Sequence, residues 1–175
     1  MIVLCGKGGS GKDTIARILK ETYGFRKAVT CTTRPKRPGE QDGVDYHFLT
    51  EEDFLKKIED GVFAEVSSTG EYMYGSPKEI YHEKNTVIIL DPNGIRQARE
   101  NAGMEKVCFI CLDADENLLR TRMLGRGDSP EKIEARITED RARFKEVEKY
   151  VDITVRQKAD TQAEELACFV AGFAG

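Results

Sequence analysis

The amino-acid sequence predicts an α/β protein in which a parallel sheet is covered by helices on both faces. Three continuous apolar runs, rich in Val and Ile, are each followed by a segment with helical spacing. Such runs are typical of strands that are buried on both faces, as they are in parallel sheets. The runs are "MIVLC" (1–5), "TVIIL" (86–90) and "VCFICL" (107–112).

The helices are predicted from the spacing of apolar residues and from capping residues. Residues 12–23 place Ile15, Ile18, Leu19 and Tyr23 on one face, and Gly24 closes this helix as a C-terminal cap. The last helix is expected over 161–173. Further helix starts are indicated by Thr50 with Asp53, by Ser76 with Pro77 and Glu79, and by Ser129 with Pro130.

Length and composition place the chain among ordinary globular proteins. With 175 residues, 39% of them hydrophobic, it is expected to form a single domain. Its net charge of −4 argues against a nucleic-acid partner, and no apolar run reaches the length that spans a membrane. Five cysteines, mostly inside apolar runs, favour reduced thiols and a cytoplasmic location. In an extended strand Cys108 and Cys111 would point to opposite faces, so we expect no shared metal.

The stretch "GKGGSGKDT" has the spacing of a phosphate-binding loop. Glycines let the backbone N–H groups turn toward a phosphate, the following helix presents its positive end, and Lys12 adds a full charge. We therefore predict that a nucleotide binds through its phosphates to Gly6, Lys7, Gly8, Gly9, Ser10, Gly11, Lys12, Asp13 and Thr14, and the family resemblance described below implies that this nucleotide is ATP. The unusual member is Asp13, because this loop normally carries Ser or Thr there to hold magnesium.

Basic residues concentrate in "RPKR" (34–37) and "RTRMLGRG" (120–127). Arg34 and Arg37 lie in a proline-stiffened segment, and guanidinium groups grip a terminal phosphate with two hydrogen bonds. Tyr46 offers a further hydroxyl. A solvated basic loop explains the same spacing equally well, so the residues alone leave both interpretations open.

Three stretches closely resemble guanylate kinase, a P-loop nucleoside monophosphate kinase. They are "TTRPKRPGEQDGVDYHF" (32–48), "GVFAEVSSTGEYMYGS" (61–76) and "RMLGRGDSPEKIEARI" (122–137), and the likeness extends over essentially the whole chain. The resemblance implies one domain in three parts. These are a core (about 1–29, 87–120 and 139–175), a GMP-binding insertion (about 30–86) and a helical lid (about 121–138).

The resemblance also implies roles for individual residues. Glu65 would read the guanine edge, because guanine presents two adjacent N–H donors and an ionised carboxylate only accepts. Lid arginines would stabilise the charge of the transferring phosphoryl group. The GMP-binding residues would be Thr30, Arg34, Arg37, Tyr46, Glu65, Tyr74, Ser76 and Asp91, and the catalytic residues Lys12, Arg34, Arg126 and Arg136, with Arg122 as a further lid arginine.

Two departures from the family concern magnesium. Asp13 replaces the loop Ser or Thr, and Ile89 replaces the first acid of a D-x-D-x-Q-G segment whose second acid is Asp91. We expect Asp13 to take over part of the binding of Mg²⁺, since a hard cation prefers oxygen ligands. A third departure is Arg156, where the family commonly has an asparagine close to adenine.

The expected reaction is transfer of the ATP γ-phosphate to GMP, giving ADP and GDP, with dGMP as a further candidate acceptor. Ribose-1,5-bisphosphate kinase is an alternative because it can also carry Gly-Lys-Asp in its loop, but it lacks the full 32–48 pattern. Non-catalytic modules that bind phosphorylated peptides lose the loop lysine and the lid arginines, which are present here. The sequence leaves open whether the protein is a monomer or a homodimer.

Overall fold

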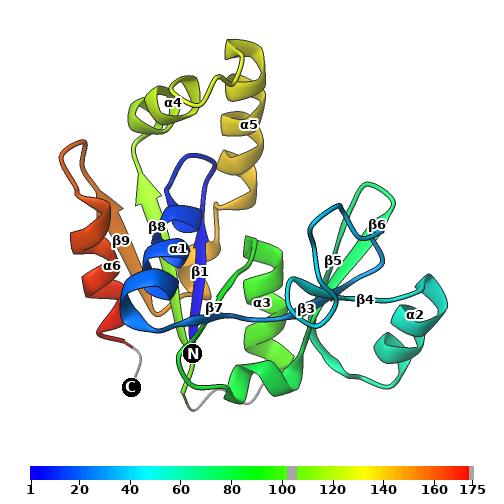
Figure 1. Ribbon diagram of the computed structural model, residues 1–175. Helices are drawn as coiled ribbons and strands as arrows, with labels where there is room; N and C mark the ends of the chain where they lie inside the picture. The colour runs from blue at the N-terminus through cyan, green and yellow to red at the C-terminus, as the bar shows by residue number, and fades with distance from the viewer. Residues whose placement is uncertain (102–105, 174–175) are drawn as a thin grey trace.

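The central sheet of the computed structural model has five strands, all parallel (Figure 1). The structure describes residues 1–101 and 106–173. In spatial order the strands are β2 (Arg26–Lys27), β7 (Thr86–Ile89), β1 (Ile2–Gly6), β8 (Cys108–Ala114) and β9 (Ile153–Gln157). The three apolar runs of the sequence thus occupy the middle of the sheet, as predicted.

Two apolar layers hold this sheet between its helices. Ile2 and Leu4 of β1 pack into one cluster with α1 (Lys12–Tyr23) and α6 (Ala163–Ala171). Val3 and Cys5 point the other way, into a cluster that includes α3 (Pro92–Asn101). The same alternation separates Cys108 from Cys111, as the strand geometry predicts.

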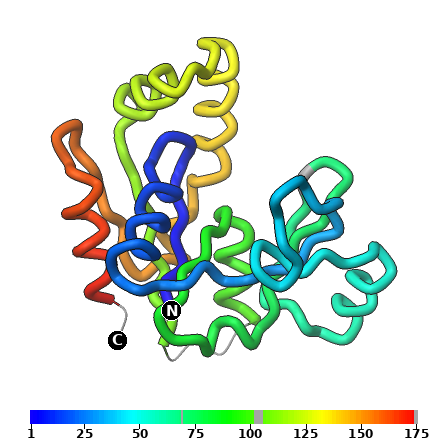
Figure 2. The backbone as a smooth tube through the Cα atoms, viewed as in Figure 1, coloured from blue at the N-terminus to red at the C-terminus, as the bar shows by residue number. Residues whose placement is uncertain are grey.

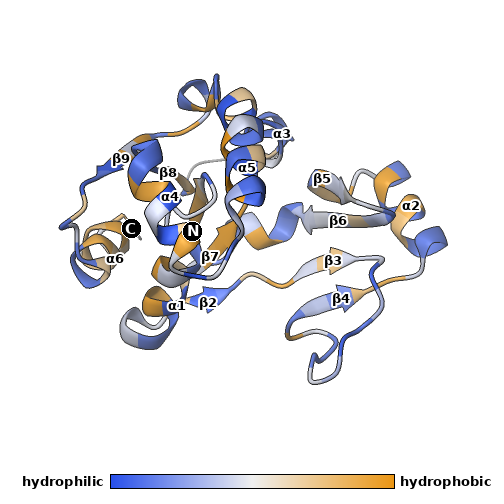
Figure 3. Ribbon diagram, turned by 90° about the horizontal axis from the view of Figure 1, so that it is seen from above, coloured by the Kyte–Doolittle hydropathy of each residue, from blue (hydrophilic) through white to orange (hydrophobic). Residues whose placement is uncertain are grey.

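A second, four-stranded sheet lies beside the first, and Figure 3 shows the two sheets set apart. Its order is β4 (Tyr46–Phe48), β3 (Thr30–Thr32), β6 (Tyr72–Pro77) and β5 (Phe63–Thr69), and only β3 and β4 are parallel. Helix α2 (Glu51–Glu59) contributes Phe54 to a separate small core with Cys31 and Phe63. The tube in Figure 2 shows the chain leaving the central sheet after β2 and returning to β7 through the 3₁₀ helix η1 (Lys78–His82).

Helices α4 (Glu116–Leu124) and α5 (Pro130–Arg143) form a hairpin beyond β8. Their own apolar contacts join them: Leu119 and Met123 of α4 pack against Ile133 and Ile137 of α5. The single-turn η2 (Val147–Lys149) then leads to β9. This hairpin contains the segment expected to be the lid, about 121–138.

The capping predictions were confirmed at two of three sites. The side chains of Thr50 and Ser129 accept hydrogen bonds from the amides of Asp53 and Lys132, and Gly24 closes α1 with a positive φ. Ser76 was wrongly assigned as a cap: it lies within β6, and its hydroxyl donates to Glu65. Within residues 1–101 and 106–173, helices are too short or too polar to cross a lipid bilayer.

Candidate active site

The glycine loop joins the end of β1 to the start of α1. Gly9 and Gly11 have φ angles of 83° and 85°, which residues with a Cβ rarely adopt. A Cβ on Gly6 would lie 2.3 Å from the Ser10 hydroxyl oxygen and 2.6 Å from the Leu112 carbonyl oxygen. The pattern of glycines is thus required by the backbone path of the loop.

The loop is held from behind by the end of β9. The Gln157 side-chain amide donates to the Ser10 carbonyl at 2.9 Å, and Arg122 of α4 donates to the Gln157 amide oxygen at 2.9 Å. Arg122 also reaches the Gly9 carbonyl at 3.3 Å. Arg122 therefore contacts the loop itself, whereas the sequence placed it only among the lid arginines.

Lys12 stands in a crowded field of charges. Burial lowers the pKa of its amine, and so do the positive charges of Arg136 and Arg126, while Asp13 and Asp140 oppose them. The charges of both predicted lid arginines therefore reach the loop lysine. Such a concentration of positive charge around backbone N–H groups suits a polyphosphate.

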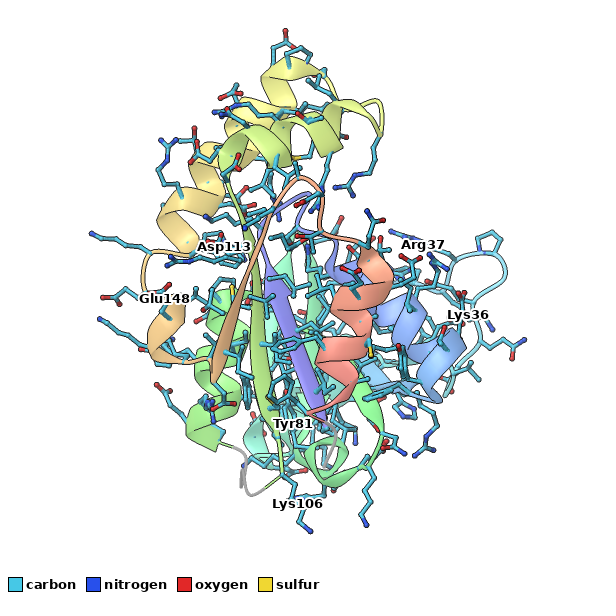
Figure 4. All side chains as sticks on the ribbon, turned by 90° about the vertical axis from the view of Figure 1, so that its left-hand side faces the viewer. Lys36, Arg37, Tyr81, Lys106, Asp113 and Glu148 are labelled. Carbon is cyan, nitrogen blue, oxygen red and sulfur yellow. The ribbon has the colours of Figure 1, made fainter. Side chains whose placement is uncertain are left out.

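Asp140 of α5 links the lid hairpin to the loop. The Gly8 amide donates to Asp140 Oδ2 at 2.6 Å, and Arg136 Nε donates to the same oxygen at 3.3 Å. Asp140 is 2% exposed, unlike most charged residues of the hairpin. Lys7, on the loop's other side, pairs with Asp113 at the end of β8, one of the residues labelled in Figure 4.

A cavity of about 600 Å³ lies between the central sheet and the second sheet. Seven of the predicted site residues line it, together with the basic side chains of Arg17, Lys20 and Lys27. One of the seven is Asp13 of the predicted phosphate loop, and the other six are Thr30, Tyr46, Glu65, Tyr74, Ser76 and Asp91. The segments that carry them are far apart in sequence, and the fold brings them to one cavity.

Glu65 is buried at the floor of this cavity. It is 5% exposed, and the Ser76 hydroxyl donates to its Oε1 at 2.5 Å. Burial raises the pKa of the Glu65 carboxyl to about 7, aided by the charge of Asp91 and opposed by Ser76. With the Ser76 hydroxyl as its one side-chain donor in the described residues, the Glu65 carboxylate has its remaining oxygen lone pairs available for a ligand.

Asp91 follows β7 at the entrance to α3. Its Oδ1 accepts the Gly94 amide at 2.7 Å, and its Oδ2 accepts Arg143 at 2.5 Å. Arg143 is the last residue of α5, so this pair connects the α4–α5 hairpin with the 600 Å³ cavity that Asp91 lines.

Arg34 and Arg37 do not line the 600 Å³ cavity that contains Glu65. Arg34 is 8% exposed and donates to Glu40 Oε1 at 2.7 Å, and this partner holds the pKa of Glu40 at about 2. The Arg37 amide donates to the other Glu40 oxygen at 2.8 Å, and Figure 4 labels Arg37 on an outer loop. The Arg34 guanidinium lies over the Tyr46 ring at 5.6 Å.

Asp13 borders two cavities at once. Besides the 600 Å³ cavity that contains Glu65, it lines a second cavity of about 450 Å³ together with Lys12, Arg126, Gln157 and Leu166. In the described ranges, clusters of three or more potential metal-ligating side chains are absent. Mg²⁺ is usually bound by one or two carboxylates together with phosphate oxygens and water, and Asp13 fits that donor set.

Sequence reasoning missed Asp140, Glu40 and Gln157. Asp140 stands four residues after Arg136, a spacing that brings side chains together on a helix and could have drawn attention to it. Glu40 lies within the quoted 32–48 segment without any role assigned. Gln157 has no local signal, because its contact with Ser10 depends on how β9 joins the sheet.

A glycine-rich phosphate loop at the end of the central strand β1, with a separate second sheet beside it, is the arrangement of P-loop nucleoside monophosphate kinases. The guanylate kinase family model matches residues 1–172. The guanylate kinase of Frankia casuarinae is 31% identical to this chain, over 98% of this chain and 97% of its own length. The guanylate kinase of Symbiobacterium thermophilum is 38% identical, over 79% of this chain and 69% of its own length. The crystal structure of guanylate kinase from Anaplasma phagocytophilum superposes with a TM-score of 0.67 at 25% identity, covering 99% of this chain and 83% of that one.

This chain belongs to the guanylate kinase family.

Proposed function

We propose that the protein transfers the γ-phosphate of ATP to GMP. The observation that carries this proposal is the meeting of two cavities at Asp13, one lined by the glycine loop and one by Glu65. Phosphoryl transfer requires the donor phosphate and the acceptor phosphate to face each other in line. Two adjoining cavities, one on each side of a phosphate loop, provide that arrangement.

On the acceptor side, Glu65 would select guanine. Its ionised carboxylate accepts hydrogen bonds from the two neighbouring N–H donors of the base, whereas adenine presents an acceptor at N1. Thr30 and Ser76 add hydroxyls to the same cavity. Tyr46 and Tyr74 line the cavity toward Arg34, which would hold the acceptor phosphate once the second sheet closes on the core.

On the donor side, the loop amides and Lys12 would bind the ATP phosphates. Arg126, which lines the donor cavity, and Arg136 would place positive charge on the phosphoryl group during transfer. Mg²⁺, when bound with ATP, neutralises charge on the β- and γ-phosphate oxygens. Asp13 would hold it directly or through water.

These roles divide the chain into three working parts. We infer that the second sheet with α2 is the GMP-binding insertion, that the α4–α5 hairpin is the lid, and that the central sheet with its remaining helices is the core. Closing the lid and the insertion would exclude water from the transferring phosphate, as in other kinases that use mobile parts.

A coupled assay of ADP release tests the proposal. ATP and Mg²⁺ are supplied with GMP, dGMP, AMP, UMP or ribose 1,5-bisphosphate in parallel reactions. Turnover confined to guanine nucleotides is the expected result. Turnover with the ribose bisphosphate alone, or binding of GMP without any turnover, would contradict it and favour a sugar-phosphate kinase or a non-catalytic module.

A further inference from the structure

Asp140 is the most deeply buried charged side chain of the lid hairpin. It is 2% exposed, whereas its neighbours Glu139 and Arg141 on α5 are exposed. Burying a carboxylate is costly unless charged or hydrogen-bonding partners compensate. The sequence therefore retains an expensive group at this position, and its partners indicate what it does.

Both partners of Asp140 belong to the phosphate-handling machinery. Its Oδ2 accepts the Gly8 amide of the loop at 2.6 Å and Arg136 Nε at 3.3 Å. Its Oδ1, although 3.3 Å from Arg136 Nε, is buried and forms no hydrogen bond within the part of the chain that the structure describes. One carboxylate thus joins the loop and a lid arginine from two different segments of the chain.

The contact with Asp140 engages one edge of the Arg136 guanidinium and not the Nη groups. A guanidinium has five N–H donors, and Asp140 takes only the one at Nε. Nη1 lies 3.9 Å from Glu139 Oε2, an ion pair that is longer than a hydrogen bond. The Nη1 and Nη2 edge is the one that grips a phosphate with two parallel hydrogen bonds. The stem of Arg136 lies directly on the loop, because a Cβ on Gly8 would be 3.2 Å from Arg136 Cγ.

We propose that Asp140 is a positioning residue for phosphoryl transfer, which fixes Arg136 over the loop and aims its Nη groups at the ATP phosphates. This inference rests on the proposed kinase activity. Asp140 acts through Arg136 and touches neither substrate. An anchored guanidinium loses little conformational freedom when the transferring phosphoryl group develops its charge, so the anchor contributes to the rate.

A double-mutant cycle between Asp140 and Arg136 tests the proposal. Asp140→Ala is expected to lower kcat about 10- to 100-fold, the cost of a misplaced catalytic group. In the Arg136→Ala background the same change should alter kcat less than about twofold, since the group being positioned is gone. Equal losses in both backgrounds would overturn the proposal, because a purely structural role is independent of Arg136.

Two further variants serve as a substitute for the alanine variant and as a control. Asp140→Asn keeps one acceptor oxygen for the Gly8 amide while losing the charge that holds Arg136, and it replaces the alanine variant in the cycle if that variant fails to fold. Glu134→Ala is the matched control, because Glu134 lies on the same helix and pairs with Arg120 at 2.7 Å, away from the loop. Its kcat should stay within about twofold of the parent.

The same double-mutant cycle is repeated with ATP affinity as the measured quantity, determined by calorimetry in the absence of any phosphate acceptor. ATP affinity should fall about threefold on Asp140→Ala when Arg136 is present and remain unchanged when it is absent. Equal losses in the two backgrounds would again overturn the role of Asp140. A parent protein that binds ATP but turns over no acceptor would contradict the proposed function alone, and this binding cycle would then decide the role of Asp140.

Discussion

Glu65 faces three polar groups from three different elements. The hydroxyl of Ser76 in β6 donates a hydrogen bond to the Glu65 carboxylate, and the negative charge of Asp91, at the entrance to α3, repels the charge of that carboxylate. The charge of Glu65 in turn affects the buried Tyr81 of η1. Tyr81 is 1% exposed, and burial, followed by the charge of Glu65, raises the pKa of its hydroxyl. Desolvation dominates at Glu65, so its pKa rises to about 7.

This pKa predicts how GMP use depends on pH. Only the ionised carboxylate accepts both guanine N–H donors, so kcat/KM for GMP should fall about tenfold per pH unit below pH 7. The titration of GMP's own phosphate, with a pKa of about 6, overlaps this step. Glu65→Gln should retain the step near 6 and lose the one near 7; an unchanged profile would mean that Glu65 does not titrate in this range.

The titration of Glu65 should also make the free energy of unfolding depend on pH. The folded pKa of about 7 is above the ordinary value of 4.5, so Glu65 stabilises the fold fully below pH 4.5, and this contribution is lost as the pH rises through 7. The free energy of unfolding of the parent, relative to Glu65→Gln, should therefore drop by about 3 kcal/mol across that window. Urea titrations at pH 4.5 and at about pH 8 measure this difference.

Asp13 gives a prediction about the metal. Asp13→Ala should lower Mg²⁺-dependent turnover about tenfold or more while leaving the binding of GMP without ATP unchanged. Asp13→Ser, which restores the usual loop hydroxyl, should recover much of the turnover. The measurement is a Mg²⁺ titration of kcat beside calorimetry with GMP, and equal losses in the two would show that Asp13 has no special part in metal binding.

At the scale of elements, the junction between β1 and the glycine loop has no space for a methyl group at Gly6. Gly6→Ala should lower the free energy of unfolding by about 2 kcal/mol or more, because its Cβ would overlap the Leu112 carbonyl oxygen, which belongs to the backbone of β8. Gly125→Ala is the control: its φ is −62° and its nearest neighbour would be 3.4 Å away. That variant should change stability by less than about 1 kcal/mol in urea denaturation.

Elements that depend on short-range signals were predictable from the sequence. The strand, loop and helix around Gly6 and the starts at Thr50 and Ser129 follow from periodicity and capping within a few residues. Ser76 was misassigned because the hydroxyl that resembles a cap is used across the sheet, by Glu65. The pairing of β3 with β4 and the burial of Asp140 depend on contacts between distant segments, which local patterns do not encode.

At the scale of the whole molecule, the two sheets have separate cores. Phe54 is fully buried and stacks on Phe63 with ring centroids 4.7 Å apart, in a cluster distinct from those of the central sheet. Phe54→Ala removes side-chain contacts worth about 3 to 5 kcal/mol from the second sheet alone. It should weaken GMP binding at least about tenfold while changing ATP affinity less than twofold, because a small separate core unfolds locally.

Leu19→Ala provides the comparison, since Leu19 is fully buried beneath the central sheet. It should lower the overall stability and reduce the fraction of protein that binds either nucleotide. Calorimetry with GMP and with ATP on both variants separates these outcomes. Parallel losses of both ligands in Phe54→Ala would mean that the two sheets unfold as one unit.

The position of β1 has a consequence for how the protein is made. This strand precedes its partners in the chain, yet it lies in the middle of the sheet, and β7 and β8 begin only at Thr86 and Cys108. Its backbone therefore has no partner strand until the ribosome has added the residues up to Thr86. Pairing between segments so far apart in sequence slows folding and leaves apolar segments exposed in the meantime.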